Sequence, residues 1–196
     1  MDENLNVSPH GSNTMLGTVR IMGRKLTSYN GEDEIYTPDE LANAIVQELK
    51  PKGIVLEPCM GGGAFTRAVS KYGLNFEWCE INKGVDFFDK ESTNADWVIT
   101  NPPFSKVFKF IKKSVELDIE NIALLVTINT IWMNGKLNFL KDNGYQLTKI
   151  YLTESPYFRR IGNWRQSGFS LGVLLIQKVN ENKPIKSTLD VGEILW

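Results

Sequence analysis

The sequence predicts one α/β domain with a mostly parallel sheet, an antiparallel strand at the sheet edge and helices on both faces. Short apolar runs alternate with helical stretches, which is typical of parallel strands joined by crossover helices. The last two predicted strands are joined without an obvious helix, which favours the antiparallel strand. A length of 196 residues with 42% hydrophobic side chains is enough for one buried core.

The first helix is expected to begin at Thr37-Pro38-Asp39-Glu40 and to end near Lys50. Thr37 is the expected N-cap, because proline then takes the first helical position and glutamate follows three residues after the cap. Leu41, Ile45 and Leu49 recur every four residues and should share one buried face. The other expected strands are 54–56, 76–80, 97–100, 122–128, 147–152 and 171–177, and the other expected helices are 64–72, 106–117 and 136–142.

The two ends of the chain differ from this pattern. Residues 1–31 are rich in Asn, Ser, Gly and Met without a sustained period, which indicates a flexible leader or flap. The folded domain is expected over 32–179. Residues 180–196 form a polar tail that should add little to the core.

Composition limits the setting and the ligands. A formal net charge of −1 gives no general attraction to phosphate, so nucleic-acid contacts must come from local Lys and Arg clusters. Cys59 and Cys79 are the only cysteines and no signal sequence is recognisable, which favours a reducing, cytoplasmic setting. No apolar run approaches the ~20 residues that cross a bilayer. A single histidine, His10, argues against a metal site.

A glycine turn follows the first strand. Glu57 ends that strand, and Gly61, Gly62 and Gly63 precede the next helix. Glycines allow a tight turn and a close backbone approach to a ligand, and ligands of parallel sheets bind beyond the carboxyl ends of the strands. The turn is therefore the expected floor of a ligand pocket, with an ordinary strand-to-helix turn as the alternative.

Acidic side chains follow the second strand. Glu80 ends it about twenty residues after the glycine turn, where nucleotide-binding folds keep a carboxylate for ribose hydroxyls. Asp86, Phe87 and Phe88 then offer a carboxylate and an aromatic face suited to adenine. The alternatives are a solvated strand end for Glu80 and core positions for the two phenylalanines.

The segment Asn101-Pro102-Pro103-Phe104 is the most specific signal in the chain. Two prolines cannot continue a central strand, so the chain must leave the sheet stiffly. The Asn101 amide and the Pro102 carbonyl can then each accept one N–H of an aromatic amine and localise its lone pair. Phe104 can stack on the ring that carries the amine. A bend stiffened by proline is the structural alternative.

These motifs together resemble a known family. Residues 35 to about 130 resemble the Rossmann-like methyltransferases that use S-adenosylmethionine (SAM), specifically the amino-methyltransferases with an Asn/Asp-Pro-Pro-aromatic motif. The motif order is similar to that of DNA adenine N6 enzymes, and the compact length is similar to that of stand-alone phage enzymes. The resemblance implies SAM as cofactor and adenine N6 in DNA as target.

The resemblance also implies roles for single positions. The catalytic tetrapeptide corresponds to Asn101, Pro102, Pro103 and Phe104. Cofactor-binding positions correspond to Tyr36, Thr37 and Pro38 beside the methionine part, Glu57, Pro58, Gly61 and Gly63 beside the amino-acid moiety, Glu80 at the ribose, Asp86 and Phe87 at the adenine, and Asn101.

Two basic segments are candidates for nucleic-acid contact. Lys106 and Lys109 lie on the helix after Phe104, where a merely solvated face is the alternative. Residues 157–166 interleave aromatics with arginines in an expected loop, a combination suited to stacking and phosphate pairing. Their candidate contacts are Arg159, Arg160, Trp164 and Arg165. A hairpin that packs Trp164 on the edge strand is the alternative.

Fewer than a hundred residues follow Phe104, which leaves little chain for a target-recognition domain and predicts low sequence specificity. Cys59 is interpreted as a small packed residue rather than a nucleophile. Other possible targets are adenine N6 or guanine N2 in RNA and a glutamine amide in protein. From a different class, the chain could be a catalytically silent binding module.

Overall fold

The computed structural model describes residues 36–131, 134–153, 157–160, 163–166, 170–180 and 188–195. The chain divides into Met1–Asp33 and Glu34–Trp196, and every described residue belongs to the second unit. The predicted leader over 1–31 therefore lies outside the described residues. Among the described helices, none is long and apolar enough to span a membrane.

A seven-stranded mixed sheet forms the centre of the described unit, as the sequence predicts. Its strands are β1 (Val55–Glu57), β2 (Phe76–Trp78), β3 (Trp97–Thr100), β4 (Asn121–Thr127), β5 (Tyr145–Thr153), β8 (Leu171–Lys178) and β9 (Asp190–Ile194). The spatial order is β2-β1-β3-β4-β8-β5-β9. Strands β1 to β4 pair in parallel, β8 runs antiparallel to both β4 and β5, and β9 pairs in parallel with β5. The antiparallel strand β8 therefore lies between β4 and β5, and β9 is the last strand on that side of the sheet.

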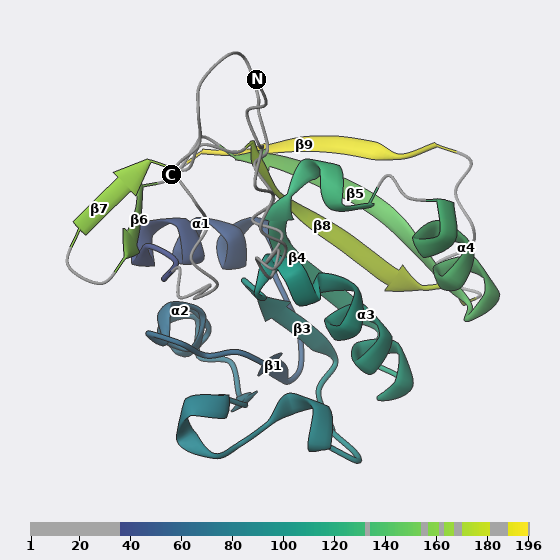
Figure 1. Cartoon of the computed structure of the whole chain (residues 1–196), viewed down its shortest axis with the longest axis horizontal. Helices are drawn as coiled ribbons and strands as arrows, with labels where there is room; N and C mark the ends of the chain where they lie inside the picture. The colour runs from purple at the N-terminus through teal and green to yellow at the C-terminus, as the bar shows by residue number, and fades with distance from the viewer. Residues whose placement is uncertain are drawn as a thin grey trace, which may run out of the picture. The chain divides into compact units, whose positions relative to one another are not determined.

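Helices cover both faces of the sheet (Figure 1). The α-helices are α1 (Asp39–Leu49), α2 (Ala64–Lys71), α3 (Val107–Glu116) and α4 (Asn134–Asp142), and the short 3-10 helices are η1 (Ile81–Lys83), η2 (Phe87–Asp89), η3 (Phe104–Lys106) and η4 (Ile128–Ile131). In β4, Ala123 and Leu125 pack with α1 and α2, whereas Ile122 and Leu124 pack with α3. This central strand is a continuous apolar run because both of its faces are buried.

Helix α1 confirms the predicted buried face but not the predicted cap. Leu41, Ile45 and Leu49 are buried. The helix begins at Asp39, and no side chain caps it. The Thr37 hydroxyl is instead bonded to Asn101, a residue 64 positions away. A tertiary contact has therefore replaced the local one that the cap motif suggests.

The segment 157–166 is a hairpin rather than the expected loop. Strands β6 (Tyr157–Arg160) and β7 (Asn163–Gln166) pair antiparallel, with Arg159 opposite Trp164. Aromatic residues favour strands, and a two-residue connection is the commonest hairpin link. The side chains of both strands lie outside the described part of the structure.

The C-terminal tail adds to the core, contrary to the sequence-based expectation. Strand β9 extends the sheet beyond β5, and the Ile194 side chain is buried in the α1 and α2 cluster. Asp190 and Glu193 of β9 are exposed, which explains the polar appearance of this segment.

Candidate active site

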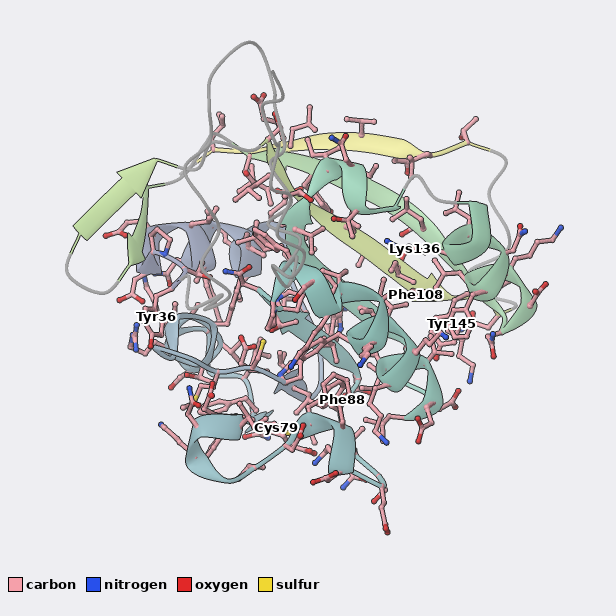
Figure 2. The ribbon with its side chains drawn as sticks, in the orientation of Figure 1. Tyr36, Cys79, Phe88, Phe108, Lys136 and Tyr145 are labelled. Atoms are coloured by element: carbon pink, nitrogen blue, oxygen red, sulfur yellow. The ribbon has the colours of Figure 1, made fainter. Side chains whose placement is uncertain are left out.

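The glycine turn connects the carboxyl end of β1 to α2, and its backbone needs glycine. Gly61 and Gly63 have φ values of +48° and +79°. These values lie in the left-handed region, which residues with a Cβ atom disfavour. A Cβ on Gly62 would lie 3.1 Å from Cδ1 of Tyr36. The Tyr36 ring therefore packs directly on the turn (Figure 2), and the glycines make room for it.

Glu80 ties this turn to the end of β2. Its Oε2 accepts a hydrogen bond of 2.6 Å from the Gly61 N–H, and its Oε1 accepts one of 3.1 Å from the Asn82 N–H. The residue is buried, and its two oxygens keep further lone pairs. Glu80 therefore shapes the turn and can still accept hydrogen bonds from ligand hydroxyls.

Glu57 is more deeply buried than Glu80. Its carboxyl group accepts a 3.2 Å bond from the Cys59 N–H and is also hydrogen-bonded to the Thr100 side chain. Burial raises the pKa of Glu57 to about 8, and the neighbouring charge of Glu80 adds to the shift, although the two hydrogen bonds oppose it. The group is largely protonated at neutral pH, and a cation beside it would favour its ionisation.

Cys59 links the glycine turn to the segment after β3. Its Sγ lies 3.3 Å from Oγ1 of Thr100 and 3.5 Å from the main-chain oxygen of Asn101. Burial raises the pKa of the Cys59 thiol, so the thiol stays neutral at physiological pH. A neutral, hydrogen-bonded thiol is a packing residue and a poor nucleophile.

Asn101 begins the segment that leaves the sheet at the carboxyl end of β3, the strand that pairs with β1. Its Nδ2 donates a 3.1 Å hydrogen bond to the Thr37 hydroxyl. Pro102 is buried, while Pro103 and Phe104 are half-buried, and Phe104 packs partly against the α1 and α2 core. The tetrapeptide is thus held close to the glycine turn on a neighbouring strand.

The expectation that Phe87 offers an open aromatic face is wrong. Its ring is buried and stacks on Phe110 with centroids 5.4 Å apart. Asp86 caps η2, because its Oδ1 accepts a 2.9 Å bond from the Phe88 N–H. The Phe88 ring is only half-buried and lies edge-on to Phe110.

Arg67 also contacts the glycine turn, although no sequence motif indicated it. Its Nη1 donates a 2.6 Å bond to the Gly62 carbonyl, and its Nη2 pairs with Asp39 at 2.5 Å. It therefore joins the glycine turn to the start of α1. The sequence feature that points to Arg67 is its position in the first turn of the helix that follows the glycine turn.

The basic candidates fall into two groups. Lys106 and Lys109 are exposed on η3 and α3, directly after the tetrapeptide. The four candidates of the hairpin, Arg159, Arg160, Trp164 and Arg165, have only their backbone described.

Comparison with known proteins identifies the fold. No family model and no curated protein matches the chain. A protein named as a class I SAM-dependent methyltransferase from Listeria monocytogenes superposes with a TM-score of 0.60 at 12% identity over 83% of this chain and 67% of its own. A protein named as an RNA methyltransferase from Pyrococcus horikoshii gives 0.55 at 13% identity over 74% and 87%.

The M protein of the type I restriction enzyme EcoKI gives a TM-score of 0.52 at 16% identity over 81% of this chain. The matched region is 48% of that protein, so the chain spans about half of its length. These likenesses show that the sheet is that of the Rossmann-like SAM-dependent methyltransferases, as the sequence predicts.

Proposed function

We propose that the chain is a SAM-dependent methyltransferase that acts on adenine N6 in DNA with low sequence specificity. One observation carries the proposal: the glycine turn and Asn101-Pro102-Pro103-Phe104 end the adjacent parallel strands β1 and β3. They are joined by the contact of Cys59 with the Asn101 carbonyl. A cofactor turn and an amine-binding segment thereby share one edge of the sheet, where ligands of such sheets bind.

The residues at the glycine turn fit SAM, which carries a sulfonium and an ammonium group. Glu57 is a buried carboxyl group that would hold the ammonium, and Glu80 offers lone pairs to ribose hydroxyls. Asp86 lies half-buried after β2, where it would accept from the adenine amine. Tyr36, Pro38, Pro58 and the main chains of Thr37 and Phe87 would complete the site, while the Thr37 hydroxyl is bonded to Asn101. When bound, SAM supplies an electrophilic methyl group.

The segment after β3 supplies what the target amine needs. An exocyclic amine on an aromatic ring is a weak nucleophile because its lone pair is delocalised. The Asn101 Oδ1 and the Pro102 carbonyl would each accept one N–H, which favours a pyramidal nitrogen with a localised lone pair. Phe104 would stack on the base after it leaves the helix.

DNA is preferred to the other targets on two grounds. The motif order resembles that of adenine enzymes, and one neighbour in fold is the M protein of a type I restriction enzyme. Lys106, Lys109 and the hairpin arginines suit phosphates of any sequence. RNA is the second candidate, because another neighbour is named as an RNA methyltransferase.

Methyl transfer from labelled SAM to DNA, RNA and protein, measured in parallel, tests this function. We expect label in DNA, recovered as N6-methyladenine in many sequence contexts. Label only in RNA or protein would refute the DNA assignment. Absence of both transfer and SAM binding in calorimetry at millimolar SAM would refute the enzyme itself.

A further inference from the structure

We propose that Thr37 is a positioning residue that fixes the orientation of the Asn101 side-chain amide for methyl transfer. This inference rests on the proposed function, because it assigns Asn101 a part in the reaction. It starts from the 3.1 Å hydrogen bond that the Asn101 Nδ2 donates to the Thr37 hydroxyl.

The two ends of the Asn101 amide have opposite chemistry. Oδ1 accepts hydrogen bonds, whereas Nδ2 only donates them. An amine that is to be methylated must give its N–H groups to acceptors and keep its lone pair toward the electrophile. A reversed amide would present a donor to the amine and compete for that lone pair.

Shape alone does not select between these orientations, because the oxygen and the NH₂ group of an amide are nearly equal in size. A hydrogen-bonding partner therefore bears on the choice, and a hydroxyl can either donate to Oδ1 or accept from Nδ2. In the structure the Thr37 hydroxyl accepts from Nδ2, which turns Oδ1 away from Thr37.

Thr37 can serve as a fixed reference because its neighbours are anchored. Tyr36 packs on Gly62, and Asp39 pairs with Arg67, which also donates to the Gly62 carbonyl. Pro38 is buried and leads into the buried face of α1. The position of the hydroxyl is thereby set by the glycine turn.

The main chain of Asn101 is held separately from its side chain. The Cys59 thiol contacts the Asn101 carbonyl at 3.5 Å, and the preceding Thr100 is buried. The bond to Thr37 restrains rotation of the side chain. This explains why Thr37 caps no helix although its sequence position suggests a cap.

Thr37→Val and Thr37→Ser in the full chain separate positioning from packing. Valine keeps the shape and removes the hydroxyl, so we expect kcat to fall about tenfold while the Kd for SAM changes less than about twofold. Serine should recover most of the loss. The double variant Thr37→Val/Asn101→Ala should be no slower than Asn101→Ala alone, since Thr37 acts through Asn101.

A matched control is Thr148→Val. The Thr148 hydroxyl is buried and bonded to the Leu175 carbonyl and to Gln177, which lies opposite Asn121 at the amino end of β4. Its loss should lower stability and leave kcat unchanged. A raised Kd for SAM with unchanged kcat in Thr37→Val, or additive losses in the double variant, would overturn the proposal.

An ¹⁵N spectrum of the asparagine side chains gives a readout without substrate. The Asn101 NH₂ signals should shift in Thr37→Val and return in Thr37→Ser, and signals that stay unchanged would overturn the proposal. If the wild-type chain methylates no amine, the proposed function fails and the positioning role fails with it. If methylation occurs but the signals do not move, only the positioning role fails.

Discussion

The turn after β1 and the segment after β3 lie side by side but are held by different chemistry. Two glutamate side chains and a guanidinium hold the turn, through Glu57, Glu80 and Arg67. Two prolines, the Thr37 hydroxyl and the Cys59 thiol hold the segment. The turn is therefore acidic, whereas the segment is neutral and leads into exposed lysines.

This contrast assigns each region a ligand. A cationic cofactor suits the acidic turn, and an anionic nucleic acid suits the basic side of the segment. Changes in the turn should therefore alter cofactor affinity and its pH dependence. Changes in the segment should alter turnover and the salt dependence of substrate binding.

The largest expected effect comes from Asn101→Ala in the segment. Turnover should fall by about a hundredfold or more, the usual scale for one polar group that stabilises a transition state. SAM affinity should stay nearly unchanged. Asn143→Ala is the control, because the Asn143 amide bonds only to a nearby carbonyl of α4 among the contacts described. Full methyl transfer by Asn101→Ala would remove the distinction between the two regions.

Glu80→Gln tests the turn in the same way. We expect SAM affinity to fall about tenfold to a hundredfold, because a hydrogen bond to a charged group is worth roughly 1.5–3 kcal/mol. Glutamine can still accept from the Gly61 N–H, but its NH₂ group cannot accept from the Asn82 N–H, so thermal unfolding of the variant is measured beside its SAM affinity. Glu77→Gln, on β2 three residues before Glu80 and paired with Lys90, should leave affinity unchanged. Equal losses in both variants would indicate a general charge effect.

Local patterns predicted most of the elements but not the contacts between them. The strand at 97–100 agrees with β3, because a buried run ending in two prolines has few other solutions. The hydroxyl of Thr37 satisfies a cap motif equally well, and only the fold brings Asn101 to it. Sequence periodicity does not show whether the Thr37 hydroxyl bonds to the adjacent helix or to a residue 64 positions away.

Two further differences have the same origin. Phe87 and Phe88 are adjacent aromatics that both contact Phe110 from α3, and only Phe87 is buried in the core. Ile194 is buried because β9 pairs with β5, more than thirty-five residues earlier in the chain. Neither pairing leaves a signal in the residues next to it.

Glu57→Gln tests the acidity of the turn through stability. The pKa of Glu57 is about 8 in the folded chain against 4.5 as its ordinary value, so between these pH values only the folded state holds the proton. The free energy of unfolding should therefore fall as pH rises, by about 1 kcal/mol per pH unit, and level off above pH 8. The glutamine variant should lose this slope.

Urea unfolding at several pH values between 5 and 8 measures that difference. Glu77→Gln is the control, because Lys90 and Thr93 hold the pKa of Glu77 below its usual range and the group stays ionised throughout. Excess SAM should reduce the slope of the wild type, since an ammonium beside Glu57 favours its ionised form. A wild-type slope retained by Glu57→Gln would contradict the assignment of the buried proton.

The smallest expected effect concerns the basic side of the segment. Lys106 and Lys109 are exposed beside the tetrapeptide, and each phosphate that they neutralise adds a slope of roughly −0.7 to −0.9 in log affinity against log salt. The double variant Lys106→Ala/Lys109→Ala should flatten that slope by about one to two units and leave SAM affinity unchanged.

Lys52→Ala/Lys141→Ala removes the same charge near the amino ends of the strands and is the matched control. If both double variants flatten the slope equally, the attraction is a net-charge effect. If neither does, other residues bind the substrate phosphates, and the hairpin residues Arg159 and Arg160 are the next pair to replace.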